Sequence, residues 1–372
     1  MMQRNILLAF LFASLPMMAD DWMARIDDYV YITQVSIPGT HDSATGHGFT
    51  GFLGVLFGES MGRTQDKTIA EQWEAGVRAF DLRPCVDGDE LRINHGILST
   101  TLTLADALNT ICTLLDEHPT EAAIVIMRHE DDGDGGDTSW SKMVVALLNE
   151  DNIKAHSADF KAVLTLGQCR GKMLLFSRDK YATNPVSGGF ISGWSHSANY
   201  TDQTKGTITA KSISVPCYVQ DFYDVSADGA TATKSAAITT MLSFYSVRNN
   251  NNRLWCINHT SGYTESSSDG YRQNASIQNK VVIDYLTETA GPTGIIMMDY
   301  AGTDSSKGID VHGMELVQAI IDNNFLYGAR GNGIESPTVY KRSTAAYYDL
   351  SGRRVDNPVS GVYVTAGRKV QY

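Results

Sequence analysis

The sequence predicts an α/β fold: an irregular (β/α)8 barrel of the TIM type with a short C-terminal β segment. Short apolar runs alternate with segments of helical period, and eight such runs occur before the chain loses this pattern. Polar side chains follow most of the runs, as they do in barrels of this kind. A length of 372 residues with 42% hydrophobic content is sufficient for one large barrel and an extra piece.

The N-terminus has the pattern of a secretory signal peptide. Arg4 precedes an apolar stretch over residues 6–15, and Ala19 stands at a plausible cleavage position before acidic residues. The apolar stretch is too short to span a bilayer. We therefore expect a signal peptide at residues 1–19 and an exported protein that is secreted, periplasmic or at the cell surface. The alternative is a buried N-terminal helix.

The catalytic barrel is expected over residues 20–328. Its eight predicted strands are residues 31–37, 77–83, 91–94, 123–128, 172–178, 214–221, 254–259 and 294–300. Predicted helices cover residues 104–117, 140–148, 236–247, 277–287 and 314–323. The connection between the first two strands and the stretch 181–213 have no regular pattern, so the barrel is predicted to be irregular.

The chemistry-bearing side chains fall at the predicted C-terminal strand ends, where barrel enzymes place their catalytic groups. These residues are His41, Arg83, His95, Arg128, Arg178, Asp221 and Asp299. Closure of the barrel makes its last strand the neighbour of its first, so Asp299 can reach His41. Asp81 and Arg83 are two residues apart and share one face of their strand.

Two imidazoles, an arginine and several carboxylates can move protons on both sides of a phosphodiester. An acid–base enzyme is therefore the first hypothesis. The formal net charge of −12 argues against nucleic acid as a partner, because its phosphates would be repelled. The same charge argues against bulk electrostatic adsorption to an anionic membrane.

Five motifs resemble those of the bacterial phosphatidylinositol-specific phospholipases C, which have an X-domain-like phosphodiesterase barrel. They occur in order between about residues 30 and 325: SIPGTHDS at 36–43, FDLR at 80–83, NHG at 94–96, VQDFY at 219–223 and MMDY at 297–300. The resemblance implies cleavage of phosphatidylinositol to diacylglycerol and inositol 1,2-cyclic phosphate. The expected partners are thus phosphatidylinositol or a related inositol phospholipid and, transiently, a membrane surface.

The resemblance also implies a role for each histidine. His41 would be the general base that takes the proton from the inositol 2-hydroxyl, with Asp299 holding its imidazole. His95 would protonate the departing diacylglycerol oxygen, helped by Asp42 and positioned by Asp81.

Arg83 would neutralise charge on the phosphate oxygens, where a bidentate guanidinium suits the geometry. In calcium-dependent relatives of animal cells this strand end carries a carboxylate ligand, whereas a guanidinium has no lone pair to offer a metal. We therefore expect no cofactor and no metal ion. The acidic loop over residues 130–137 lacks EF-hand spacing and is interpreted as solvated.

Inositol recognition is assigned by the resemblance to Arg128, Arg178, Asp221 and Tyr223. Arg128 stands where the relatives usually have lysine, and its guanidinium would contact hydroxyls differently. The alternative for both arginines is a structural salt bridge. Among the remaining histidines, His259 is the one whose strand-end position could place it in the site.

An apolar segment over residues 49–57 follows the first strand, where relatives place a short helix that dips into lipid. Phe52, Leu53, Leu56 and Phe57 are the expected membrane contacts. The alternative is that this segment packs into the core of the barrel. The tail at residues 329–372 contains two β-type runs around Asn357–Pro358, and it resembles sorting or β-sandwich tails of exported bacterial proteins. A strand pair packed on the barrel is equally compatible.

Three functions are compatible with these observations. The first is phosphatidylinositol cleavage, with extension to glycosylphosphatidylinositol anchors if the pocket is open beyond the inositol. The second is a glycerophosphodiester phosphodiesterase, which would need a metal-binding Glu-x-Asp pair that Asp81-Leu82-Arg83 does not supply. The third is a non-catalytic inositol- or glycan-binding protein, which would not need a paired base and acid.

Overall fold

The computed structural model describes residues 21–130, 137–181, 188–194, 204–247, 252–265 and 267–327, and five strand segments in the tail. The expected signal peptide at residues 1–19 lies outside the described residues and stays a prediction. In the described part of the chain, none of the helices is both long and apolar enough to cross a membrane.

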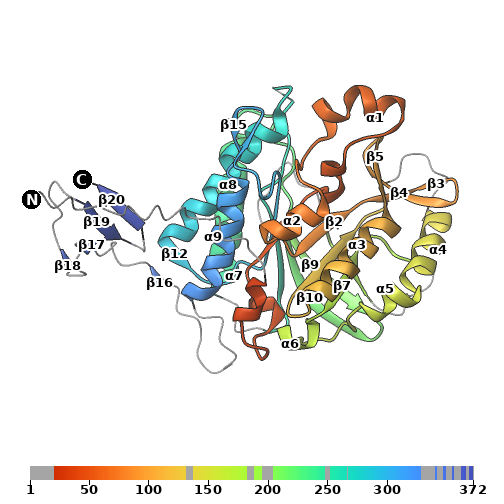
Figure 1. Cartoon of the computed structure of the whole chain (residues 1–372), viewed down its shortest axis with the longest axis horizontal. Helices are drawn as coiled ribbons and strands as arrows, with labels where there is room; N and C mark the ends of the chain where they lie inside the picture. The colour runs from red at the N-terminus through yellow and green to blue at the C-terminus, as the bar shows by residue number, and fades with distance from the viewer. Residues whose placement is uncertain are drawn as a thin grey trace, which may run out of the picture.

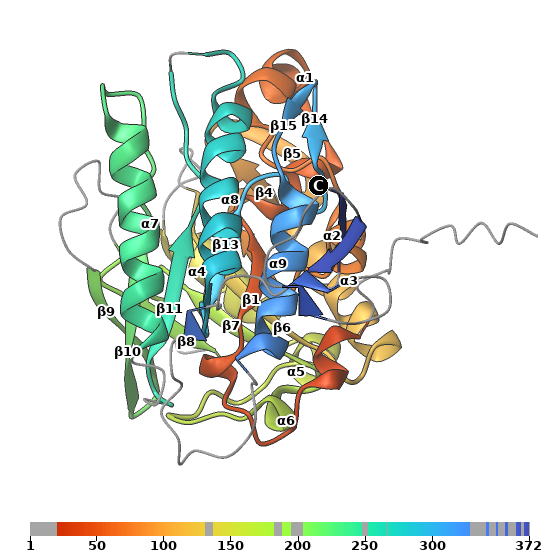
Figure 2. The ribbon, with the colours of Figure 1, turned by 90° about the vertical axis from the view of Figure 1, so that its left-hand side faces the viewer.

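Nine of the described strands close into a barrel (Figures 1 and 2). Around the barrel they are β1 (Ile37–Thr40), β13 (Ile295–Met298), β11 (Trp255–His259), β10 (Ile213–Gln220), β9 (Thr204–Ala210), β8 (Gly189–Ser192), β7 (Lys172–Ser177), β6 (Ala122–Met127) and β2 (Ala79–Leu82). Neighbouring strands are parallel, except that β9 is antiparallel to both β8 and β10. The predicted irregular barrel is confirmed, as is the pairing of its first and last strands.

The predicted strand at residues 91–94 is a strand but does not belong to the barrel. It lies in β4 (Glu90–His95), between β3 (Pro84–Asp87) and β5 (Leu98–Thr103) in a separate antiparallel sheet. Since β3 begins two residues after β2 ends, the chain is too short here for a crossover to a parallel neighbour. The chain reverses in a tight hairpin between β3 and β4 instead. His95, the last residue of β4, therefore lies in the separate sheet and not in a barrel strand.

The barrel is completed by β8 and β9, which come from the stretch 181–213 that the sequence pattern left irregular. Ile191 and Ile208 pair across these two strands, and both are buried. The predicted first strand, residues 31–37, was placed too early and shares only Ile37 with β1. Residues Ile32–Gln34 form a 3-10 helix (η2), and the strand starts only at Ile37.

Helices surround the barrel, and Figure 2 shows α7, α8 and α9 side by side along one flank. The helices are α2 (Ile69–Ala75), α3 (Leu104–Glu117), α4 (Asp137–Leu148), α5 (Asp151–Ala155), α6 (Leu166–Cys169), α7 (Ala230–Ser246), α8 (Gly270–Glu288) and α9 (Gly313–Leu326). All five predicted helices are present. Four of them, α4, α7, α8 and α9, begin between one and seven residues before the predicted start.

Smaller strands lie outside the barrel. β14 (Ser305–Ser306) pairs with β15 (Ile309–Asp310), and β12 (Thr289–Ala290) pairs with β16 (Tyr340–Lys341) of the tail. Four further tail strands form an antiparallel sheet: β18 (Arg354–Val355), β17 (Tyr347–Tyr348), β19 (Val362–Thr365) and β20 (Arg368–Gln371). The predicted β character of the tail is present, and a sorting role for it stays a prediction.

The segment after β1 forms η3 (Ser43–His47), α1 (Gly51–Phe57) and the π-helical turn η4 (Gly58–Gly62). Both views place α1 at the upper edge of the molecule (Figures 1 and 2). Its apolar side chains are exposed, with Phe52 at 79% and Val55 at 72% of the maximum. The alternative that this segment packs into the barrel core is therefore wrong.

A buried ion pair anchors the start of β2, opposite the strand end that carries Arg83. Arg78 Nε donates to Glu121 Oε2 at 2.9 Å, and both side chains are completely buried. The Arg78 guanidinium also lies over the Trp73 ring, with Cζ 4.0 Å from the ring centroid. A buried ion pair loses most when only one partner is removed, because the other charge stays buried and uncompensated.

We expect Arg78→Met to lower the free energy of unfolding by about 3–5 kcal/mol, because the apolar replacement still packs on Trp73 but leaves Glu121 unpaired. Urea denaturation followed by circular dichroism measures this. The control is Arg92→Met, whose guanidinium pairs with the exposed Asp87 and Glu90, and a change within about 1 kcal/mol is expected there. Equal losses in the two variants would contradict the expectation.

Candidate active site

The register of the barrel strands brings the predicted residues together. Thr40 in β1 pairs with Met298 in β13, so the residues that follow them, His41 and Asp299, emerge side by side. On the other side of β1, Thr40 pairs with Phe80 of β2, so Asp81 emerges next to His41. Parallel strands end at one edge of a sheet, and in a closed barrel that edge is a ring.

His41 lies between two carboxylates and is 2% exposed. Its Nδ1 is 2.9 Å from Asp299 Oδ1, and its Nε2 is 3.1 Å from Asp42 Oδ2. The other oxygen of Asp299 accepts from the backbone N–H of Gly262. An ionised Asp299 accepts from Nδ1–H, and Nε2 is then the nitrogen that can accept another proton.

Burial lowers the pKa of His41 well below its ordinary value of 6.5, and the positive charge of Arg83 lowers it further. The imidazole is therefore neutral at pH 7. A neutral imidazole with its lone pair on Nε2 is the form that a general base requires.

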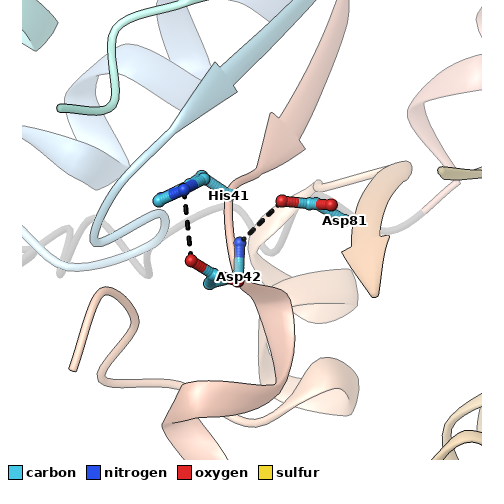
Figure 3. A group of neighbouring side chains, drawn as sticks. All are labelled: His41, Asp42 and Asp81. Carbon is cyan, nitrogen blue, oxygen red and sulfur yellow. Dashed lines mark hydrogen bonds and ion pairs between the residues drawn. The ribbon is translucent and has the colours of Figure 1, made fainter. Parts of the chain in front are cut away.

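Asp42 contacts several charged groups of the site, and Figure 3 shows it joined to His41 and to Asp81. Its Oδ1 is 2.9 Å from Arg83 Nε, and its Oδ2 faces both histidines, at 3.1 Å from His41 Nε2 and 3.5 Å from His95 Nε2. Its backbone N–H donates to Asp81 Oδ2 at 3.3 Å. Asp42 has a φ of 45°, in the left-handed region that a residue other than glycine rarely adopts. Burial raises its pKa to about 6.

Arg83 is 6% exposed and is held by two aspartates. Its Nε and Nη2 donate to Asp81 Oδ2 at 3.0 and 2.8 Å, and Asp42 lies on its other side. Burial acts to raise the pKa of Asp81, but the charges of Arg83 and Arg178 outweigh it and the pKa is lowered. The expected sharing of one strand face by Asp81 and Arg83 therefore appears as a direct ion pair.

His95 reaches the site from the β3–β4–β5 sheet. Its Nδ1 donates to the carbonyl oxygen of Gly62 at 2.7 Å, and its ring centroid is 6.3 Å from that of His41. Positioning of His95 by Asp81 stays a prediction: the two ring nitrogens of His95 face the Gly62 carbonyl and the Tyr271 hydroxyl, and Asp81 Oδ2 binds Arg83 and the Asp42 backbone. The expected contact with Asp42 is present, at 3.5 Å.

Glu130 is a site residue that the sequence analysis missed. The acidic loop was interpreted as solvated, but Glu130 is 8% exposed, and residues 131–136 of that loop lie outside the described residues. Its Oε1 accepts from Gly96 N at 2.8 Å and lies 3.9 Å from Arg83 Nη1. Its position just after β6, at the same barrel end, was the available signal.

Three of the four expected inositol-binding residues lie near this centre. Asp221, just after β10, accepts from Trp194 Nε1 at 2.8 Å, and Arg178 stacks on the same indole with Cζ 4.0 Å from the ring centroid. Burial lowers the pKa of Arg178 to about 10. The Tyr223 hydroxyl is 3.2 Å from that of Tyr271.

Arg128 has 35% of its side chain accessible, and its Nη1 lies 3.5 Å from Glu130 Oε2. His259 joins the site as its strand-end position predicted. Its ring centroid is 6.1 Å from that of His41, and its Nδ1 is 2.9 Å from Ser261 Oγ. Burial lowers the pKa of His259 to about 4, so this imidazole is also neutral.

His41, Asp42 and Asp81 offer ligand atoms that all lie within 4.8 Å of one another, a spacing that could suit a metal ion. However, Arg83 approaches both aspartates within 3.0 Å. A metal ion would need these two carboxylates as ligands, but the Arg83 guanidinium already pairs with both of them. The arrangement therefore fits carboxylates neutralised by an arginine better than it fits a metal site.

We expect the His41 imidazole to titrate below pH 6.5, since burial and the Arg83 charge disfavour its protonated form. Nitrogen-15 NMR of histidine-labelled protein measures this, with His41→Ala to assign the resonance. In Arg83→Met the loss of a neighbouring positive charge moves the titration to higher pH. A wild-type midpoint above 6.5 would contradict the assignment of His41 as a neutral buried base.

Comparisons with known proteins find similar chains and a similar fold. Residues 35–179 match the family model described as "Phosphatidylinositol-specific phospholipase C, X domain", and that segment runs from just before β1 to just after β7. A 1-phosphatidylinositol phosphodiesterase of Staphylococcus aureus strain Newman is 25% identical over 320 residues, which cover 84% of this chain and 96% of the relative. The Listeria monocytogenes protein of the same name is 26% identical over 295 residues, 77% of this chain and 83% of the relative.

Solved structures of such proteins have the same fold. A crystal structure of the phosphatidylinositol-specific phospholipase C from Staphylococcus aureus superposes with a TM-score of 0.66 at 24% identity, covering 82% of this chain and 97% of that one. The Listeria monocytogenes structure gives a TM-score of 0.60 at 22% identity, covering 82% and 99%. Residues 35–179 are therefore similar to the X domain of phosphatidylinositol-specific phospholipase C, and the chain shares the barrel fold of the bacterial proteins of that name.

Proposed function

We propose that this protein is a phosphatidylinositol-specific phospholipase C that releases diacylglycerol and forms inositol 1,2-cyclic phosphate. The observation that carries the proposal is the pair of imidazoles with ring centroids 6.3 Å apart and an arginine-paired carboxylate in contact with both. Base, acid and phosphate-neutralising cation are thus adjacent. The similarity to proteins named 1-phosphatidylinositol phosphodiesterase supports the same reaction class.

In the proposed reaction the inositol 2-hydroxyl loses its proton to His41 Nε2 and its oxygen attacks phosphorus. The bond between phosphorus and the diacylglycerol oxygen breaks, and His95 gives that oxygen a proton. Asp299 stabilises the imidazolium that forms on His41. Arg83 donates to the phosphate oxygens as negative charge builds on them, an electrostatic contribution that is often the largest in such reactions.

Asp42 links the proposed general base to the proposed general acid. One of its oxygens faces Nε2 of both histidines. When His41 gains a proton and His95 loses one, the total charge around this carboxylate is unchanged. Such an exchange avoids leaving an uncompensated charge in a buried site, which would be unfavourable by several kcal/mol.

For substrate recognition we propose that Arg178, Asp221 and Tyr223 bind the inositol hydroxyls or ring, with Arg128 at the more exposed edge. Cleavage of glycosylphosphatidylinositol anchors is a second part of the proposal, since a glycan on the inositol would extend past that edge. Export is a third part. It rests on residues 1–19 alone.

Membrane contact is proposed for α1. Phe52, Leu53, Leu56 and Phe57 are 40–79% exposed, whereas side chains of this size are usually buried. A cluster of exposed apolar side chains marks an interaction surface. Insertion of this helix into a lipid surface would offset the unfavourable net charge of −12 through burial of apolar area.

The first experiment assays phosphatidylinositol in mixed micelles with and without a chelator, with phosphorus-31 NMR to identify the product. We expect a cyclic phosphodiester resonance and an unchanged rate in the chelator, because Arg83 replaces the metal ion. Loss of activity in the chelator would instead favour the metal-dependent glycerophosphodiesterase alternative. Parallel assays of phosphatidylcholine and a glycosylphosphatidylinositol anchor define the specificity.

The matched variants are His41→Ala and His95→Ala, for which we expect losses of about 10²–10⁴-fold in kcat, the usual contribution of a general base or acid. An unchanged kcat in either variant would contradict the proposed roles of the two histidines. An inactive wild-type protein that still binds inositol lipids would support the third alternative, a binding protein.

A second experiment measures binding to vesicles of phosphatidylcholine with phosphatidylinositol. We expect Phe52→Ala to weaken binding about 10-fold or more, since burial of a phenylalanine side chain is worth about 1.5–3 kcal/mol. The control is Tyr29→Ala, because Tyr29 is equally exposed, at 77% against 79%, but precedes β1 at the other end of the barrel strand. Equal weakening in both variants would refute a specific role for α1.

A further inference from the structure

Tyr271 is a buried residue in direct contact with the proposed general acid, and the sequence motifs gave no sign of it. It is the second residue of α8 and is 6% exposed. Its hydroxyl oxygen lies 3.2 Å from His95 Nε2 and 3.2 Å from the Tyr223 hydroxyl oxygen. One side chain therefore touches both the acid and the expected inositol-binding tyrosine.

The fold holds this ring in place. α8 follows β11, so its first turn lies at the barrel end where the strands carry the site. The Tyr263 ring packs against Tyr271 with centroids 4.8 Å apart. Next to it, a Cβ on Gly270 would lie 2.2 Å from the Thr264 carbonyl oxygen, so a glycine is needed for the loop to approach this closely.

Hydrogen-bond chemistry defines what the hydroxyl does. The Gly62 carbonyl can only accept, so Nδ1 of His95 carries a proton and the neutral ring has its lone pair on Nε2. The Tyr271 hydroxyl can donate to that lone pair. When Nε2 is protonated, the same oxygen can accept its N–H while the Tyr271 O–H donates to the Tyr223 oxygen. A hydroxyl satisfies both states of the acid, which a carboxylate or a carbonyl cannot do.

Tyr271 itself stays neutral, because burial raises its pKa above the ordinary value of 10. Nε2 is also the atom that must deliver the proton to the leaving oxygen, so its direction determines whether the transfer succeeds. A group that fixes this direction before substrate arrives would act on the leaving-group step. It would have little effect on attack by the 2-hydroxyl.

We propose that Tyr271 is a positioning residue that aims Nε2 of His95 at the leaving oxygen and links it, through Tyr223, to inositol binding. The inference rests on the proposed function, since it refines the role of His95 in the same reaction. The coupling works through two hydroxyl contacts in series. The substrate ring that orders Tyr223 thereby also orders the acid.

The test uses Tyr271→Phe with two soluble substrates, a short-chain phosphatidylinositol and an inositol aryl phosphodiester with a nitrophenolate leaving group. We expect kcat on the alkyl substrate to fall about 3- to 10-fold, the effect of one hydrogen bond. On the aryl substrate it stays within about 2-fold, because nitrophenolate leaves without a proton. The control is Tyr263→Phe, which keeps the ring packing and should match wild type on both substrates.

Adding Tyr223→Phe to Tyr271→Phe tests the link to inositol binding. The double variant should lose less on the alkyl substrate than the product of the two single losses, because both changes interrupt one chain of contacts. Independent losses would overturn the link. Equal losses on alkyl and aryl substrates in Tyr271→Phe, or no loss on either, would overturn the positioning role.

Nitrogen-15 NMR of histidine-labelled protein separates this inference from the proposed function, because it needs no turnover. The Nε2 resonance of neutral His95, assigned with His95→Ala, should shift in Tyr271→Phe and stay in place in Tyr263→Phe. An unchanged resonance would overturn the contact. If the wild-type protein is inactive, the proposed function is refuted. The Nε2 chemical shift of His95 in Tyr271→Phe still shows whether Tyr271 contacts His95.

Discussion

The geometry of the site depends on the buried carboxylate of Asp42. One oxygen pairs with Arg83, and the other faces Nε2 of His41 and of His95. These three partners come from β1, from the end of β2 and from the antiparallel sheet that follows β2. A charge buried to this degree is tolerated only when it is paired, so Asp42 and its partners hold each other in place. Its left-handed backbone conformation, with φ at 45°, is a further sign that the surrounding structure constrains it.

Charge balance explains why arginines and aspartates occur together at this barrel end. Asp81, Asp42 and Glu130 all lie within 4 Å of the Arg83 guanidinium. Lys234, completely buried on α7, donates to the Phe222 carbonyl, and burial lowers its pKa to about 8. Fixed cations thus neutralise the carboxylates that orient the histidines. At the opposite end of β2 the buried pair of Arg78 and Glu121 serves stability alone, which matches the usual division of such barrels into a catalytic and a stabilising face.

The residues that sequence reasoning placed correctly are those directly at the ends of parallel strands. His41, Asp299 and Arg83 could be placed because strand closure and a two-residue period determine which side chains meet. His95 was assigned to a barrel strand and is instead carried by a hairpin. Glu130 and Tyr271 were missed, since their positions depend on the path of a loop and on the first turn of a helix. Loop paths are set by packing against other segments, which a local pattern does not contain.

The sequence by itself determined the barrel class, the five helices, the pairing of first and last strands and the family motifs, because hydrophobic period and strand-end chemistry are local properties. Only the tertiary structure decided that β8 and β9 complete the barrel, that α1 is exposed and that the Gly62 carbonyl binds Nδ1 of His95. It also decided that Tyr271 meets His95 across 176 positions of chain. Contacts of that kind depend on which surfaces pack against each other in the folded protein. A local sequence pattern does not contain that information.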